Sequence, residues 1–381
     1  MKNFLVVILS VAFSVLLIEG LLIWRPEFQA RPPSSKWVIC TAPSRPGRPH
    51  PLFGWTGAPD IAYFEQTSEA DGWTAHINNS DGFRDLFDSG NKHAFVLGDS
   101  FTQGVNANNN ETFPYLLDLW NPDIAFHDFG VPQYGTQNSL LIYKFFSPNI
   151  SHELTVLAYF LGNDLHDNMS KHNYDMRPAS QQNISFEEQL KEVNSQLRQT
   201  FRTYNLLYSF ARSFFGGFAL SPEEIEKGIK ITRILLEELA NETKSNRSDL
   251  LLVALPSWNQ MKDLRGVEEE FAQQMALLEE IANRWDHIYL IDISNIFDRM
   301  DLDEVYGIKD KHFSPYGYYL TAKAIHEWIG SEWPRGPQAG TQAPPFQPSL
   351  VRIEPECAVM PEYREGVATR SRQNAQTTAR R

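Results

Sequence analysis

Three short motifs supply the side-chain types that acyl chemistry uses, and the first of them contains a serine. Gly98-Asp99-Ser100 directly follows the apolar run of residues 93–97. This places a serine at the carboxyl end of a buried strand, where parallel α/β sheets keep their chemistry and the next helix presents free backbone N–H groups. Its hydroxyl can act as a nucleophile when a base and an oxyanion site reach it.

The second motif, Gly162-Asn163-Asp164, follows the apolar run of residues 154–161. An asparagine amide is neutral, and at a strand end its N–H group is fixed by the scaffold. Asn163 is therefore a candidate oxyanion donor. An ordinary Asn-Asp turn would explain the same residues.

The third motif, DKHFSP at residues 310–315, places a histidine on a loop just ahead of a helix. From there His312 can reach a serine at a strand end and accept its proton. The nearby carboxylate of Asp310 can hold the imidazole ring by its other nitrogen. Without the other two motifs, His312 would be interpreted as an exposed loop side chain.

The segments between these motifs predict an α/β domain. Nearly continuous apolar runs are typical of strands covered on both faces, and their alternation with helices favours a doubly wound parallel sheet. A serine, a proline and two glutamates at residues 221–224 indicate a helix start. The expected strands are residues 93–97, 124–129, 154–161, 250–255 and 287–293, and further helices are expected over 267–284 and from residue 314 onward.

In the order Ser, Asn, Asp, His, the motifs resemble the SGNH (GDSL-like) hydrolase family over about residues 92–331. The resemblance implies that Ser100 is the nucleophile, His312 the general base and Asp310 the residue that orients it. Asn163 and the backbone N–H of Ser100 would hold the oxyanion, without a metal or cofactor. The implied fold is a flavodoxin-like three-layer sandwich with a central parallel sheet and one inserted helical segment.

Two positions depart from the family pattern. The family's second glycine, which helps form the oxyanion hole, falls within residues 130–136, where the alternatives are Gly135 and Gln133. We assign the role to Gly135, although a backbone N–H group would also be available at Gln133.

The second departure is the position of the aspartate that orients the histidine, because many members have this aspartate three residues before the histidine. Here that position is Lys309, and Asp310 lies only two residues before His312. Related polysaccharide O-acetyl esterases and acyltransferases have a similar Asp-x-His spacing. Asp303 or Glu304 could substitute for Asp310, or the enzyme could use a Ser–His dyad.

Other candidate site residues have simpler interpretations. Consecutive loop residues rarely converge on one ion, so we do not predict a metal site at Asp164, His166 and Asp167. Aromatic residues near the motifs could stack on a sugar, but packing is their more frequent role. They are Tyr134, Tyr174, Tyr316, Tyr318 and Tyr319.

Composition limits the possible partners. The 381 residues are 42% hydrophobic, enough for one substantial core with additional segments. The formal net charge of −13 argues against a nucleic-acid partner. Cys40 and Cys357 form neither a disulfide framework nor a metal knuckle, although they could pair in an oxidising compartment.

The N-terminus predicts a membrane anchor. Residues 4–24 form an apolar run whose only charge is Glu19, and as a helix they would rise ~31 Å, close to the thickness of a bilayer core. The poor A-x-A pattern after the run favours an uncleaved signal anchor over a cleaved signal peptide. The expected location is the bacterial inner membrane, with a single-pass anchor and the catalytic domain in the periplasm or outside the cell.

The expected organisation has five parts. The 165–220 insertion is interpreted as an amphipathic helix packed on the domain, with a lid or a membrane-facing helix as alternatives. The lead-in contains Asn-Ser-Asp-Gly-Phe-Arg at residues 79–84, a motif similar to one in membrane-tethered bacterial members of the family. The parts are the anchor (1–25), a Pro-rich linker (26–51), the lead-in (52–91), the hydrolase-like domain (92–331, with the 165–220 insertion) and a disordered tail (332–381).

We therefore predict an extracytoplasmic serine esterase. Its expected substrate is an ester-bearing small molecule or polysaccharide, most simply an acetyl ester on a cell-envelope or exported polysaccharide. One alternative is an O-acyltransferase that uses the same serine. Another is a non-catalytic carbohydrate-binding or assembly protein that keeps the fold.

Overall fold

The computed structural model describes residues 19, 36–41, 45–67, 72–85, 90–169, 220–262, 268–336, 343–346 and 355–357. The chain divides into two compact units, and the larger comprises Trp37–Ser180 and Leu220–Arg381. The predicted anchor, apart from Glu19, and residues 170–219 of the predicted insertion lie outside the described residues. Within the described ranges, no helix is long and apolar enough to cross a membrane.

The core of the larger unit is a five-stranded, fully parallel sheet with strand order β10-β9-β8-β6-β7. Numbered along the chain this order is 2-1-3-4-5, which is the flavodoxin-like arrangement. All five predicted strands are confirmed, each within one residue at either end. They are β6 (Lys92–Gly98), β7 (Ile124–Gly130), β8 (Leu154–Phe160), β9 (Asp249–Leu255) and β10 (Ile288–Asp292).

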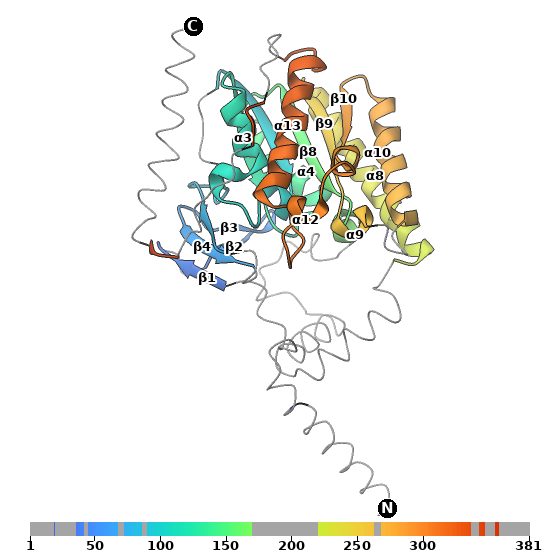
Figure 1. Cartoon of the computed structure of the whole chain (residues 1–381). Coiled ribbons are helices and arrows are strands. Elements are labelled where there is room, and N and C mark those ends of the chain that lie inside the picture. Colours follow the sequence, from blue (N-terminus) through green and yellow to red (C-terminus); the bar gives the residue numbers. More distant parts are fainter. Residues whose placement is uncertain are drawn as a thin grey trace, which may run out of the picture. The chain divides into compact units, whose positions relative to one another are not determined.

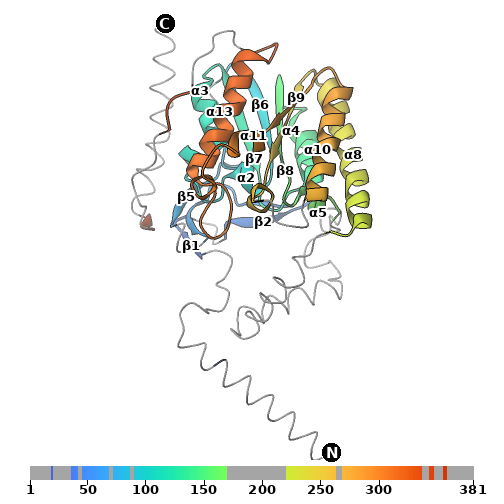
Figure 2. The ribbon, with the colours of Figure 1, turned by 45° about the vertical axis from the view of Figure 1, so that its right-hand side comes forward.

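Helices cover both faces of this sheet, as the continuous apolar runs predict. Along β6, Ala94 and Val96 pack into one hydrophobic cluster, while Phe95 and Leu97 pack into the other. Figures 1 and 2 show the sheet between its two helical layers. One layer contains α3 (Phe113–Trp120) and α13 (Pro315–Ser331), and the other contains α4 (Thr136–Phe146), α8 (Pro222–Ser245) and α10 (Glu268–Arg284).

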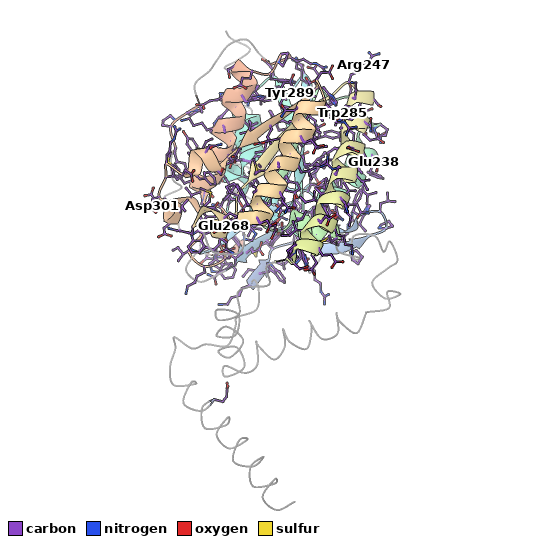
Figure 3. The ribbon with its side chains drawn as sticks, turned by 90° about the vertical axis from the view of Figure 1, so that its right-hand side faces the viewer. Glu238, Arg247, Glu268, Trp285, Tyr289 and Asp301 are labelled. Carbon is purple, nitrogen blue, oxygen red and sulfur yellow. A yellow bond between two sulfur atoms is a disulfide. The ribbon has the colours of Figure 1, made fainter. Side chains whose placement is uncertain are left out.

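The helix starts follow from local capping chemistry. Ser221 and Glu224 form a reciprocal capping box at the start of α8, with Pro222 as its first residue. The hydroxyl of Ser314 accepts hydrogen bonds from two backbone N–H groups at the start of α13. On the outer surface α8 and α10 run side by side (Figure 3), and the ion pairs Arg233–Glu280 and Arg284–Glu237 join them.

Two small sheets precede the central one. Figure 1 shows their strands at the end of the domain where α9 (Trp258–Met261) and α12 (Leu302–Val305) lie. The Pro-rich linker predicted for residues 26–51 thus contains strands in its described part, with Pro49 tolerated because it lies in a two-stranded edge ribbon. One sheet has the order β1 (Lys36–Ile39), β4 (Ala62–Gln66), β5 (Thr74–Ile77), and the other pairs β2 (Gly47–His50) with β3 (Gly54–Gly57).

The described parts of the C-terminal segment are anchored to the domain. Trp333 is buried and donates its indole N–H to Asp249, 2.8 Å away. Phe346 packs against two tyrosines of α13. Cys357 forms a disulfide with Cys40. These contacts differ from the disorder predicted for 332–381, because aromatic burial and a covalent bond hold the residues that make them.

Candidate active site

A sharp turn between β6 and the short helix α2 (Ser100–Gln103) presents the serine hydroxyl. The Asp99 carboxylate caps this helix by accepting the Phe101 backbone N–H at 2.8 Å. A Cβ atom at Gly98 would lie 2.2 Å from the Thr102 hydroxyl and 2.9 Å from the Ala158 carbonyl oxygen. Only glycine therefore fits at Gly98, and the turn places Ser100 at the carboxyl edge of the sheet.

The structure brings Ser100, His312 and Asp310 into one hydrogen-bonded row. Nε2 of His312 lies 2.9 Å from Oγ of Ser100, although the two residues are 212 positions apart. Nδ1 of the same ring lies 3.0 Å from Oδ2 of Asp310. The carboxylate places the imidazole proton on Nδ1, which leaves Nε2 free to accept the serine proton.

The short spacing between Asp310 and His312 is accommodated by the backbone. Lys311 adopts a left-handed conformation with φ of 65°. The chain therefore turns so sharply that Asp310 accepts both the ring Nδ1–H and the backbone N–H of His312, the latter at 3.2 Å. Asp303 and Glu304 are exposed on α12, so Asp310 is the carboxylate that contacts the histidine.

The second oxygen contact of Asp310 comes from Asn106, a residue that the sequence analysis did not identify. The Asn106 amide donates to Oδ1 of Asp310 at 2.5 Å, and its own oxygen accepts the hydroxyl of Thr67. Asn106 is buried and has φ of 66°, a left-handed conformation that asparagine tolerates better than most residues. A continuous chain of hydrogen bonds thus runs from Thr67 to Ser100.

These contacts keep the Asp310 carboxyl ionised. Burial alone would raise the pKa of Asp310, but hydrogen bonds and charge attraction from His312, with a further hydrogen bond from Asn106, lower its pKa below the ordinary value. The residue is therefore a carboxylate at neutral pH.

The candidate oxyanion residues lie on two neighbouring loops. Asn163 lies between the end of β8 and the start of α5 (Asp164–Met169). Burial raises the pKa of Asp99 to about 7, and a hydrogen bond from the Asn163 side chain partly opposes that rise. Gly135 caps the start of α4, and a Cβ atom there would lie 2.6 Å from the side-chain oxygen of Asn168. Close packing against α5 is thus sufficient to explain a glycine at Gly135.

Gln133 has the backbone geometry that ordinarily selects glycine. Its φ is 66°, and Tyr134 donates its N–H to the Val131 carbonyl at 3.2 Å across the turn. With Pro132 as the second residue, Gln133 occupies the third position of this turn, where a positive φ favours glycine. Close packing therefore explains the glycine at Gly135, whereas the positive φ that usually selects glycine is found at Gln133.

Two buried carboxyl groups flank the nucleophile without forming a metal centre. Burial raises the pKa of Asp164 well above its ordinary value and also raises the pKa of Asp99, and the negative charge of Asp167 adds to both shifts. Asp164 accepts the Phe160 backbone N–H at 3.1 Å, which is a structural role. His166 is exposed, and no group of three or more potential ligand side chains in the described residues could hold a metal.

The aromatic candidates for sugar stacking have packing roles in the described part of the chain. Tyr134 and Tyr318 are buried, and the Tyr318 hydroxyl donates to the Val105 carbonyl. Tyr316 and Tyr319 pack against Phe346, and Tyr174 lies outside the described residues.

Comparison with known proteins returns lipolytic proteins of the G-D-S-L family, the family that the motifs resemble. The crystal structure of a member from Veillonella parvula is 12% identical to this chain, with a TM-score of 0.36. The aligned region covers 61% of this chain and 94% of the Veillonella protein. A putative lipolytic protein of this family from Desulfitobacterium hafniense has 16% identity and a TM-score of 0.36, covering 62% and 98%. A two-domain esterase active on acetylated mannans has 13% identity and a TM-score of 0.38, covering 68% and 53%. No protein-family model and no curated protein sequence matches the chain.

Proposed function

We propose that this protein is a serine ester hydrolase of the SGNH type. One observation carries the proposal: the hydroxyl of Ser100, both ring nitrogens of His312 and the carboxylate of Asp310 form a row with spacings of 2.9 and 3.0 Å. That row holds a nucleophile, a general base and the group that orients the base, which are the parts of a catalytic triad.

The reaction follows from this geometry. Oγ of Ser100 attacks the ester carbonyl carbon while Nε2 of His312 takes its proton, and the carbonyl oxygen becomes an oxyanion. As the tetrahedral intermediate collapses, the C–O bond to the alcohol breaks and His312 gives its proton to the departing oxygen. Water, deprotonated by the same nitrogen, then attacks the acyl-enzyme and releases the acid.

Three groups are assigned to the oxyanion. The backbone N–H of Ser100 lies in the first turn of a helix, where N–H groups have no partner within the helix. The Asn163 amide is the second donor. For the third, Gly135 was the choice from sequence, but the left-handed turn at Gln133 supports the backbone N–H of that residue instead, because packing already explains the glycine at Gly135.

The proposed substrate is an acetyl ester on a cell-envelope or exported polysaccharide, and the proposed location is outside the cytoplasm. The Cys40–Cys357 disulfide supports this location, since such bonds persist in oxidising compartments. The apolar run of residues 4–24 supports a single-pass inner-membrane anchor. An O-acyltransferase that uses the same serine is the second candidate, favoured by the Asp-x-His spacing of residues 310–312.

The test uses the full chain with p-nitrophenyl acetate as substrate. We expect hydrolysis in the parent protein and a loss of about 10³-fold or more in kcat for Ser100→Ala. Ser151→Ala, which changes an exposed serine, is the matched control and should retain the parent rate. Added xylotetraose that becomes acetylated faster than acetate is released would favour the transferase. Equal rates for Ser100→Ala and the parent would contradict both candidates.

A further inference from the structure

Two lysines and a tryptophan gather beside the proposed triad. Trp258 begins α9, which follows β9 and therefore lies at the carboxyl edge of the sheet, the edge that also presents Ser100. Nζ of Lys311 lies 4.4 Å from the centre of the Trp258 ring, and Nζ of Lys262 lies 5.8 Å from it. Both ammonium groups are within cation–π range of one ring.

The position of Lys311 is tied to the triad by its backbone. It lies between Asp310 and His312, and its left-handed conformation is the one that lets these two residues meet. The Trp258 ring then holds the ammonium group of Lys311 on α9. The residue next to the general base in sequence thus carries a positive charge that is held against an aromatic ring.

The two lysines of this cluster bring like charges together. The two distances to one ring centre place the ammonium groups at most about 10 Å apart, so they repel each other. Among the described residues, no carboxylate lies within 4 Å of either group. Other lysines of this acidic chain do have carboxylate partners: Lys92, Lys144, Lys230, Lys244 and Lys323.

We propose that Trp258, Lys262 and Lys311 form a subsite for a carboxylate group carried by the substrate. This inference rests on the proposed function and narrows its substrate class to an O-acetylated acidic polysaccharide, in which a uronate carboxylate lies near the ester. The carboxylate offsets the repulsion between the two lysines and fixes the sugar while Ser100 attacks the acetyl group. A neutral polysaccharide brings no charge that offsets this repulsion.

The experiment compares two esters with the full chain: chemically O-acetylated tetragalacturonate and chemically O-acetylated xylotetraose. The measured quantity is the ratio of kcat/KM for the acidic ester to kcat/KM for the neutral ester. We expect a ratio of about 10 or more for the parent at low salt, decreasing as salt screens the charges. The ratio should fall about fivefold or more in Lys262→Gln and further in Lys262→Gln/Lys311→Gln.

Using a ratio removes any effect of these variants on the chemical step, since both esters use the same triad. Lys227→Gln on α8, an exposed lysine remote in sequence from the cluster, is the matched control and should keep the parent ratio. A parent ratio near 1, or a double variant with the parent ratio, overturns the subsite and leaves the esterase standing.

A protein that is not an esterase would cleave neither ester, which distinguishes failure of the proposed function from failure of the subsite. If the parent cleaves neither ester, the subsite is tested by titration calorimetry of unacetylated tetragalacturonate against the full chain. Binding that is lost in the double variant supports the subsite without the esterase. Absence of binding by the parent overturns the subsite.

Discussion

Asn106 determines how firmly the histidine of the proposed triad is oriented. Asp310 has two oxygens, of which one contacts the His312 ring and the other accepts the amide of Asn106. Asn106 is in turn fixed by Thr67, so the carboxylate cannot rotate away without breaking a partly buried network. Asn106 is thus a positioning residue that acts through Asp310.

We predict that Asn106→Gly lowers kcat by ~10–100-fold with KM changed by less than about twofold, because a loosened carboxylate misaligns the general base. Glycine tolerates the left-handed backbone, so this variant removes the amide without adding strain. Thr67→Val, which removes only the far end of the network, should lower kcat less. Steady-state kinetics with p-nitrophenyl acetate measure both values, and a parent-like kcat for Asn106→Gly would refute the positioning role.

At this scale the sequence predicted some contacts and missed others for a physical reason. The contact between Ser100 and His312 was predictable because one follows an apolar run and the other precedes a helix start, and such positions converge at one edge of a parallel sheet. The oxyanion role of Asn163 stays a prediction. Asn106 and Asp310 are 204 positions apart. No local pattern marks an asparagine whose function depends on a partner that only folding brings near.

At the scale of elements, the lead-in segment builds the support beneath the nucleophile turn. Asn79 caps its own turn by accepting the N–H groups of residues 81–83. Gly82 has φ of 97° and packs against Gly57 so closely that a Cβ would clash. These contacts bring Arg84 into the core, where it donates to the carbonyl oxygens of Gln103 and Gly104, both at 2.8 Å, and to that of residue 107.

Arg84→Met should therefore destabilise the protein by ~3 kcal/mol or more, because several buried carbonyl groups lose their donor. Arg84→Lys should recover only part of this loss, since an ammonium group cannot reproduce the planar guanidinium fork. Chemical denaturation measures the change, with Arg48→Met at the exposed edge of β2 as the control. An Arg84→Met variant as stable as this control would contradict the supporting role of the lead-in.

Strand β7 carries a pH-dependent contribution to stability. Burial raises the pKa of Asp128 to about 8, despite a hydrogen bond from the Gly130 N–H and the charge of Arg84, both of which lower it. A raised folded-state pKa gives stability that is present below the ordinary pKa and is lost as pH rises toward 8. Wild-type stability should therefore fall between about pH 4 and pH 8.

Asp128→Asn should remove this decline, because the amide cannot ionise and still accepts the Gly130 N–H. We expect the variant to gain ~2–4 kcal/mol relative to the parent between pH 5 and pH 8, measured by urea denaturation at both pH values. Parallel pH profiles for the two proteins would show that Asp128 is not the titrating group.

The strands and helices were predictable to different degrees. The central strands are apolar on both faces, and α8 begins with serine, proline and glutamate, so their signals are local. The small strands β1–β5 have only four or five residues each, and Gly and Pro within β2 and β3 break the alternating pattern that identifies a strand. Their formation depends on packing against the domain that follows.

At the scale of the whole molecule, a disulfide joins two segments that are 317 residues apart, and Cys40 continues directly from β1. Closing so long a loop restricts the unfolded chain far more than the folded one. The sequence allowed this pair but could not establish it, because the two cysteines lie in segments without a regular pattern.

Cys357→Ser should lower the free energy of unfolding by ~2–4 kcal/mol. Reduction of the parent with dithiothreitol should lower its Tm to that of Cys357→Ser, and reduction of Cys357→Ser should cause no further change. Thermal unfolding of both proteins with and without reductant tests this. A Tm of the parent that is insensitive to complete reduction would contradict a stabilising disulfide.

The central claim is that Ser100 is a nucleophile activated by His312, and covalent labelling tests it most directly. The full chain is treated with a fluorophosphonate, digested and analysed by mass spectrometry, beside Ser100→Ala and His312→Ala. We predict one stoichiometric adduct on the peptide that contains Ser100, absent from Ser100→Ala and formed at least about 10²-fold more slowly in His312→Ala. An adduct on another residue, or a folded parent protein that remains unlabelled, would contradict the account.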